Sequence, residues 1–114
     1  MAMSDCLFCR MMAREIKPEV AYEDDQVLAI HDIHPQAPVH LLIIPKKHIE
    51  RIDCLHESDK DLVGDMIFKA KQIAAQNGWK HYRLVFNNGT EAGQSIFHIH
   101  LHLLSGRRMI WPPG

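Results

Sequence analysis

Residues 95–104 read SIFHIHLHLL, an apolar run in which His98, His100 and His102 occupy every second position. Side chains of a β-strand alternate between its two faces. A strand over this run would therefore present all three imidazoles on one face. The intervening apolar side chains would then point into the core: Phe97, Ile99, Leu101 and Leu103.

Three interpretations of the alternating histidines can be compared. A solvated strand face would select histidine no more often than Thr, Lys or Glu, so it leaves three in succession to coincidence. A zinc ion shared by all three is hindered, because His98 and His102 would lie about 13 Å apart at Cα while Zn–N bonds are about 2 Å. Two neighbours could share an ion more easily. In the third interpretation the row is catalytic: His100 attacks, and its neighbours handle protons and charge.

The polar loop that precedes the run is suited to holding an anion. In NGTEAGQ (88–94), Gly89 and Gly93 permit close backbone approach, and Gln94 and Ser95 add side-chain donors. A phosphoryl group carries charge on several oxygens and needs many donors around it. The loop therefore makes phosphorus the expected target of a histidine nucleophile.

Composition limits the kind of partner. The 114 residues carry 13 basic and 14 acidic side chains without a long Lys/Arg block, so we expect no binding to long nucleic acid. The first residues lack the features of a secretory signal, and no stretch approaches the roughly 20 apolar residues of a membrane span. We expect no membrane association and a cytoplasmic location.

Local patterns predict a single α+β domain over residues 1–114, an antiparallel sheet of about five strands with one long helix on a face. The long helix should run from about Asp59 to Asn77, capped by Ser58 and stopped by Gly78. The other predicted elements are a short helix within 6–15 that stops before Pro18, a hairpin of strands 19–24 and 26–33 around Asp24–Asp25, and strands 38–45, 82–87 and 95–104.

Several segments resemble the histidine triad (HIT) superfamily, and its HINT branch in particular. They are HIHLHLL (98–104) within NNGTEAGQSIFHIHLHLL (87–104), HDIHPQAPVHLLIIPKKH (31–48) and the tail WPPG (111–114). The resemblance covers nearly the whole chain. It implies a HIT-like fold and a homodimer whose long helices and central strands pack across a two-fold axis.

The resemblance also implies an activity. HINT proteins hydrolyse purine nucleoside phosphoramidates, in which AMP or GMP is joined to an amine, through a nucleotidyl-histidine intermediate and without an organic cofactor. Alternatives are a dinucleoside polyphosphate hydrolase, a nucleotidyltransferase, or a nucleotide-binding scaffold without activity. An in-line nucleophile argues against the scaffold, because binding alone does not need one.

Catalytic roles follow from the resemblance, position by position. His100 matches the nucleophile, and the main-chain carbonyl of His98 would orient its ring. His102 and His40 match the histidines that complete the phosphate site. Ser95 matches the hydroxyl near the leaving amine.

Nucleotide contacts follow in the same way. Asp32 matches the carboxylate that accepts from ribose hydroxyls, a role that its two oxygens suit. The remaining matches are the phosphate-loop residues Asn87, Gly93 and Gln94, the base-pocket residues Leu7, Phe8, Met11, Ile30 and Ile33, and Trp111, which would reach the partner subunit's site. Without the resemblance, most of the apolar residues would be taken as ordinary core.

Cys6 and Cys9 form a Cys-x-x-Cys pair, which in a reducing compartment more often binds metal or does redox chemistry than forms a structural disulfide. Many bacterial HIT proteins carry this pair, and the resemblance implies a structural zinc held with His48 and His98. Two thiolates and two imidazoles close a tetrahedral site. The alternatives are a redox dithiol and simple packing as small apolar residues. Cys54 is expected to be inert.

Overall fold

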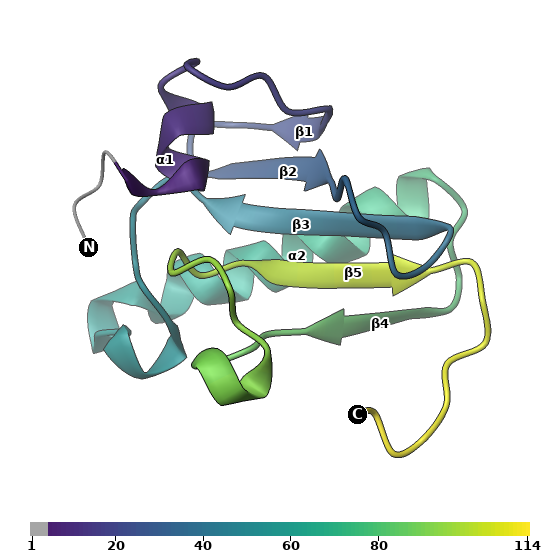
Figure 1. Cartoon of the computed structure of the whole chain (residues 1–114). Helices are drawn as coiled ribbons and strands as arrows, with labels where there is room; N and C mark the ends of the chain where they lie inside the picture. The colour runs from purple at the N-terminus through teal and green to yellow at the C-terminus, as the bar shows by residue number, and fades with distance from the viewer. Residues whose placement is uncertain (1–4) are drawn as a thin grey trace.

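The computed structural model describes residues 5–114, which form one antiparallel five-stranded sheet with a helix on each face (Figure 1). The strand order is β1-β2-β3-β5-β4. The helices are α1 (Leu7–Met12) and α2 (Lys60–Gln76), with short 3-10 turns η2 (Ile52–Cys54), η3 (Glu57–Asp59) and η4 (Thr90–Ala92). The strands are β1 (Val20–Glu23), β2 (Val27–His31), β3 (Val39–Pro45), β4 (Tyr82–Val85) and β5 (Leu101–Ser105). The predicted α+β class and the five-stranded sheet are confirmed.

Both faces of the central strands are buried, which explains why β2 and β3 read as continuous apolar runs. Alternate side chains of β2 and β3 pack under α2, against Met66, Ala70 and Ile73. The other alternate side chains pack under α1, against Cys6 and Phe8. Figure 1 shows α2 behind the sheet and α1 in front of it. A sheet covered on both sides needs apolar residues at every position, not at every second one.

The last strand is shorter than its sequence pattern predicts. β5 begins at Leu101 and pairs with β3 and β4, so His98 and His100 precede the strand and only His102 lies on it. The main chain leaves the sheet where the Ile99 N–H donates to the carbonyl of Ile49, at 2.7 Å. His98 is consequently fully buried, and Phe97 is half-buried instead of in the core. The prediction of three imidazoles along one strand face was wrong in this respect.

The long helix α2 agrees with its predicted range, but its start is built differently. Asp59, not Ser58, is the N-cap residue, and it makes no side-chain capping bond to the helix. Its carboxylate instead accepts from the His56 N–H at 2.9 Å and pairs with Lys47, two residues after β3. Gly78 follows the helix with φ +74°, the left-handed conformation expected of a C-terminal stop.

The N-terminal region contains the predicted short helix and hairpin. α1 ends at Met12, three residues before the predicted range does, and Arg14 takes φ 67° in the turn that follows. The Asp24–Asp25 turn is present, because the carboxylate of Asp24 accepts from the N–H groups of Gln26 and Val27. β1 and β2 pair antiparallel around it.

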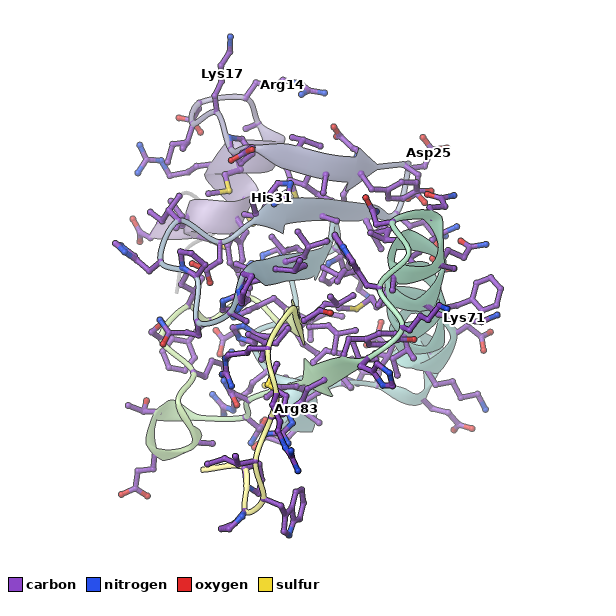
Figure 2. The ribbon with its side chains drawn as sticks, turned by 90° about the vertical axis from the view of Figure 1, so that its right-hand side faces the viewer. Arg14, Lys17, Asp25, His31, Lys71 and Arg83 are labelled. Carbon is purple, nitrogen blue, oxygen red and sulfur yellow. The ribbon has the colours of Figure 1, made fainter. Side chains whose placement is uncertain are left out.

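Charged side chains extend outward from this core. Figure 2 shows Lys17 beyond the N-terminal helix and Lys71 on the side of α2 that faces away from the sheet. Within residues 5–114, no helix combines the length and the apolar character that crossing a membrane requires.

Met66 tests the packing of α2 on the sheet. Its side chain is fully buried in the core cluster, so Met66→Ala should lower the free energy of unfolding by about 2–5 kcal/mol through lost burial and a residual cavity. Urea unfolding followed by circular dichroism measures this. Gln72→Ala, on the exposed face of the same helix, is the matched control and should change stability by less than about 0.5 kcal/mol. Equal effects of both substitutions would contradict this packing.

Candidate active site and metal cluster

His100 lies directly before β5, and a main-chain group sets its tautomer. Its Nδ1 is 2.8 Å from the carbonyl oxygen of His98. A carbonyl only accepts, so Nδ1 carries the proton and the lone pair of Nε2 is free. Phe8 packs edge-on against the ring at 5.1 Å. Burial lowers the pKa of His100, which keeps the ring neutral and nucleophilic near pH 7.

His40 and His102 form a second pair whose protons can be placed by the same reasoning. The Gln36 main-chain N–H donates to Nδ1 of His40 at 3.0 Å, so the proton of a neutral His40 is on Nε2. That Nε2 lies 2.9 Å from Nδ1 of His102 and 3.5 Å from a carboxylate oxygen of Asp32. Nδ1 of His102 therefore accepts, and its own proton is on Nε2.

Burial keeps this pair uncharged. It lowers the pKa of His40, although Asp32 opposes the shift. The pKa of His102 falls to about 4, mainly through burial and further through the nearby His100 and His40. At neutral pH His102 is therefore a neutral hydrogen-bond donor through Nε2.

The atoms of Asp32, His40 and His102 that could bind a metal lie within 4.8 Å of one another, close enough to suggest a metal site. The tautomer of His40 argues against one. A metal on Nε2 would require the proton to move to Nδ1, where it would face the Gln36 N–H. The three side chains are better described as a hydrogen-bond network.

A second cluster has the geometry of a metal site. The ligand atoms of Cys6, Cys9, His48 and His98 lie within 4.8 Å of one another. Nδ1 of His98 is 3.2 Å from Sγ of Cys6 and 3.6 Å from Sγ of Cys9. Nδ1 of His48 is 3.3 Å from Sγ of Cys9 and 3.1 Å from Nδ1 of His98. A tetrahedral zinc with bonds of 2.0–2.3 Å separates its ligands by about 3.3–3.8 Å, so the four residues fit such an ion closely.

The tautomer of His98 also fits. Its Nε2 is 2.7 Å from the Pro45 carbonyl oxygen and must donate to it, which leaves the Nδ1 lone pair facing the two cysteines. Cys6 is the N-cap of α1, and the first turn of the helix brings Cys9 next to it. The cluster thus joins α1, the segment after β3 and the segment before β5. Nε2 of His48 is buried and has no hydrogen-bond partner among the described residues.

The loop before His98 is shaped by a buried glutamine. Oε1 of Gln94 accepts from the Gly89 N–H at 2.9 Å, and Nε2 donates to the carbonyls of Glu50 and Ile96 at 2.7 and 3.0 Å. Its side-chain donors are therefore used within the protein. The sequence had suggested instead that they would point to an anion. Gly93 takes φ +102°, which allows the tight turn.

The other predicted nucleotide contacts range from buried to exposed. Phe8 and Ile30 are buried in the cluster under α1, and Phe8 touches the rings of both His98 and His100. Ile33 and Trp111 are 85% and 82% exposed. Leu7 and Ser95 are exposed, and Met11 and Asn87 are half-buried.

Gln36 is the residue that sequence reasoning missed. It acts through its main-chain N–H, so its side-chain type carries no signal. Its place between Pro35 and Pro38, shortly before His40, is the only hint in the sequence of an ordered turn there.

Comparison with known proteins identifies the family of this chain. The HIT domain model matches residues 13–109. A HIT-like protein of Synechocystis sp., described as uncharacterized, is 48% identical over 96% of this chain and 97% of its own length. A HIT family hydrolase of Legionella pneumophila has 50% identity and a TM-score of 0.93 over 96% of this chain and all of its own. A histidine triad protein of Clostridium difficile has 35% identity and a TM-score of 0.91, with 96% and 97% covered. The chain therefore belongs to the HIT domain family.

Proposed function

We propose that this protein is a hydrolase of the HINT branch that cleaves purine nucleoside phosphoramidates, AMP or GMP joined to an amine. The observation that carries the proposal is the hydrogen bond from Nδ1 of His100 to the His98 carbonyl, because it leaves Nε2 as a free nucleophile. The description of the Legionella pneumophila relative as a hydrolase supports the reaction class.

The reaction would proceed in two displacements. Nε2 of His100 attacks phosphorus, a new P–N bond forms, and the bond to the amine breaks. The amine leaves with a proton delivered through Ser95 or a neighbouring histidine. Water then attacks phosphorus, the bond to His100 breaks, and the nucleoside monophosphate leaves with the water oxygen. Nε2–H of His102 would donate to a phosphate oxygen. The N–H groups of Gly93 and Gln94 already donate to the carbonyls of Thr90 and Gly89, so further donors would come from the side chains of Asn87 and Ser95.

The nucleotide would lie between two groups of residues. Oδ1 of Asp32 accepts from the His34 N–H at 2.8 Å, which fixes the carboxylate while leaving lone pairs for ribose hydroxyls. The base would contact Ile33 and the apolar surface around α1. These contacts to Leu7, Phe8, Met11, Ile30, Ile33, Asn87, Gly93, Gln94 and Trp111 stay predictions.

We also propose that Cys6, Cys9, His48 and His98 bind one structural Zn²⁺. Burial, together with the nearby Cys6, raises the pKa of Cys9 to about 11, so the thiolate needs a cation to form. Four protein ligands leave no open position for substrate. The ion would cross-link three segments and hold His98, whose carbonyl orients His100.

The assembly we propose is a homodimer of single HIT domains, residues 1–114, in the cytoplasm. β4 is an edge strand of the sheet, and edge strands are pairing surfaces. The apolar side chains of Ile67, Phe68, Ile110 and Trp111 are exposed on α2 and the tail. The cytoplasm would keep Cys6 and Cys9 reduced and available to metal.

His100→Ala should lower turnover of a fluorogenic adenosine phosphoramidate by at least about 10³-fold, because it removes the nucleophile. AMP affinity, measured by calorimetry, should stay within a few-fold, since the ring acts mainly in the transition state. His81→Ala, at an exposed histidine directly before β4, is the control. Turnover retained in His100→Ala would exclude the mechanism, and no release by the wild type above this variant would favour a scaffold.

Elemental analysis tests the zinc site. The wild type should contain about one zinc per chain, and a Cys6→Ser, Cys9→Ser double variant should contain almost none, because its two thiolate ligands are lost. Cys54→Ser removes a thiol outside the cluster and should keep the metal. Full zinc content in the double variant would refute the assignment.

The dimer can be measured by light scattering on an eluting peak. The expected mass is twice the 13.1 kDa of the chain. Phe68→Glu should weaken association at least about tenfold by placing a charge in an apolar interface. Gln76→Glu, at the end of the same helix, adds the same charge as a control. A monomeric wild type at micromolar concentration would disprove the dimer.

A further inference from the structure

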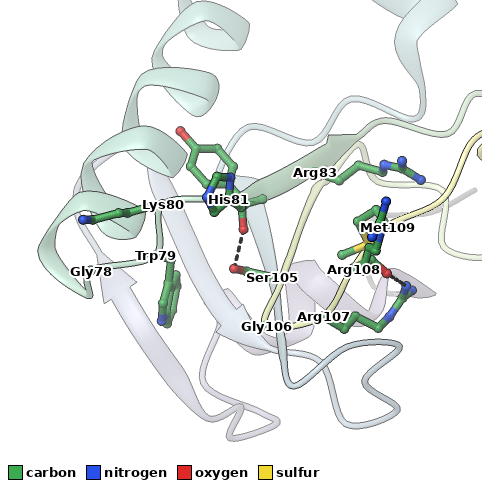
Figure 3. Close-up of a pocket in the computed structure, with 11 residues that line it drawn as sticks. Gly78, Trp79, Lys80, His81, Arg83, Ser105, Gly106, Arg107, Arg108 and Met109 are labelled. Atoms are coloured by element: carbon green, nitrogen blue, oxygen red, sulfur yellow. Dashed lines mark hydrogen bonds between the residues drawn. The ribbon is translucent and has the colours of Figure 1, made fainter.

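The turn at Gly106 and Arg107, directly after β5, packs against the loop between β2 and β3. Gly106 has φ +95°, and a Cβ there would come within 2.9 Å of the Pro38 side chain, so the Gly106 main chain packs directly on the Pro38 ring. Next to this contact, Nε of Arg107 donates to the carbonyl oxygen of Gln36 at 2.9 Å. Figure 3 shows Arg107 beside Arg108, whose carbonyl accepts a second bond from Arg107, at 3.2 Å.

This contact is continuous with the candidate active site. Gln36 accepts from Arg107 through its carbonyl and donates to Nδ1 of His40 through its N–H. His40 in turn contacts Nδ1 of His102. A chain of three hydrogen bonds thus connects an exposed arginine after β5 to a histidine of the triad.

The Gln36 N–H, together with the Asp32 carboxylate oxygen 3.5 Å from Nε2 of His40, determines what His102 can offer to a phosphate. With the Gln36 N–H on Nδ1 of His40, both histidines carry their protons on Nε2, and His102 presents a donor. If that N–H turned away, His40 could carry its proton on Nδ1 and accept at Nε2. His102 would then donate through Nδ1 and present a lone pair to the phosphate oxygens, which repels them.

The loop that carries Gln36 is anchored at its start, where the Asp32 N–H donates to the His40 carbonyl oxygen at 2.9 Å. The His34 N–H bonds to Asp32, and Nε2 of Gln36 donates to the His34 carbonyl at 3.0 Å; both bonds lie within the loop. The bond from Arg107 comes from outside it and holds the main chain of Gln36 itself.

We propose that Arg107 is a positioning residue: by holding the main chain of Gln36, it keeps His40 and His102 in the tautomers that make His102 a phosphate donor. The value of that donor for catalysis rests on the function proposed above. The tautomers themselves do not, and they can be measured without substrate.

The test compares three variants of the full-length protein at pH 7. Arg107→Met keeps the aliphatic stem but removes the donor, and Arg107→Lys keeps a donor in reach of the Gln36 carbonyl. Arg108→Met is the matched control, because only the main-chain carbonyl of Arg108 takes part in the network. Circular dichroism and thermal melting confirm that each variant is folded.

Long-range ¹H–¹⁵N spectra of the histidine rings give the decisive readout. The wild type and Arg108→Met should show Nε2 protonated in both His40 and His102. Arg107→Met should show a measurable population of the Nδ1-protonated form of these two rings, and Arg107→Lys should restore most of the original signal. Unchanged tautomers in Arg107→Met would overturn the proposal, whatever happens to activity.

Kinetics supply the second readout. Arg107→Met should lower kcat/KM for the adenosine phosphoramidate by about 3- to 10-fold, the value of one hydrogen bond, while Arg107→Lys recovers most of it. A tautomer change without any loss in an active enzyme would overturn the positioning role. A tautomer change in a protein that lacks this activity altogether would leave the positioning intact and reject only the proposed function.

Discussion

His98 is the residue on which the local structure depends most. A fully buried imidazole must satisfy both ring nitrogens, because an unpaired polar group away from water is costly. One nitrogen donates to the Pro45 carbonyl at the end of β3, and the other faces the two cysteines of α1. These contacts fix the main chain at His98, and its carbonyl then orients His100. The proposed nucleophile is therefore aimed by a neighbour whose own side chain is fixed to two other segments.

Main-chain groups decide the chemistry of each histidine in this site. The carbonyls of Pro45 and His98 fix the proton of His98 on Nε2 and that of His100 on Nδ1. The Gln36 N–H fixes that of His40 on Nε2. A carbonyl and an N–H have opposite effects on a neutral ring. His98 therefore turns a lone pair toward the cysteines, His100 has a free lone pair on Nε2, and His40 has a donor on Nε2. Because these contacts come from the main chain, changing the side chain of Gln36 would leave its bond to His40 largely in place. A bond made by a side chain would be lost on substitution.

Much of the architecture could be predicted from local pattern alone. Apolar periodicity placed α2 and the five strands, and Gly78 marked the end of the helix. The errors share one cause, which is that contacts between distant segments override local preference. The bond from Ile99 to Ile49 keeps β5 from starting before Leu101, and the pairing of Asp59 with Lys47 replaces the expected cap at Ser58. Neither partner is near in sequence, so no window of a few residues contains the signal.

The sequence by itself determined the residue types of the site and their grouping: alternating histidines, a Cys-x-x-Cys pair and a glycine-containing loop next to the triad. Motif similarity added their expected roles. Only the tertiary structure decided which nitrogen of each imidazole is free, that Gln94 is used to build the loop, and that Gln36 and Arg107 belong to the same network as His102. The physical reason is that a proton's position depends on the group facing it across space, and for His102 that group is His40, 62 residues away in the sequence.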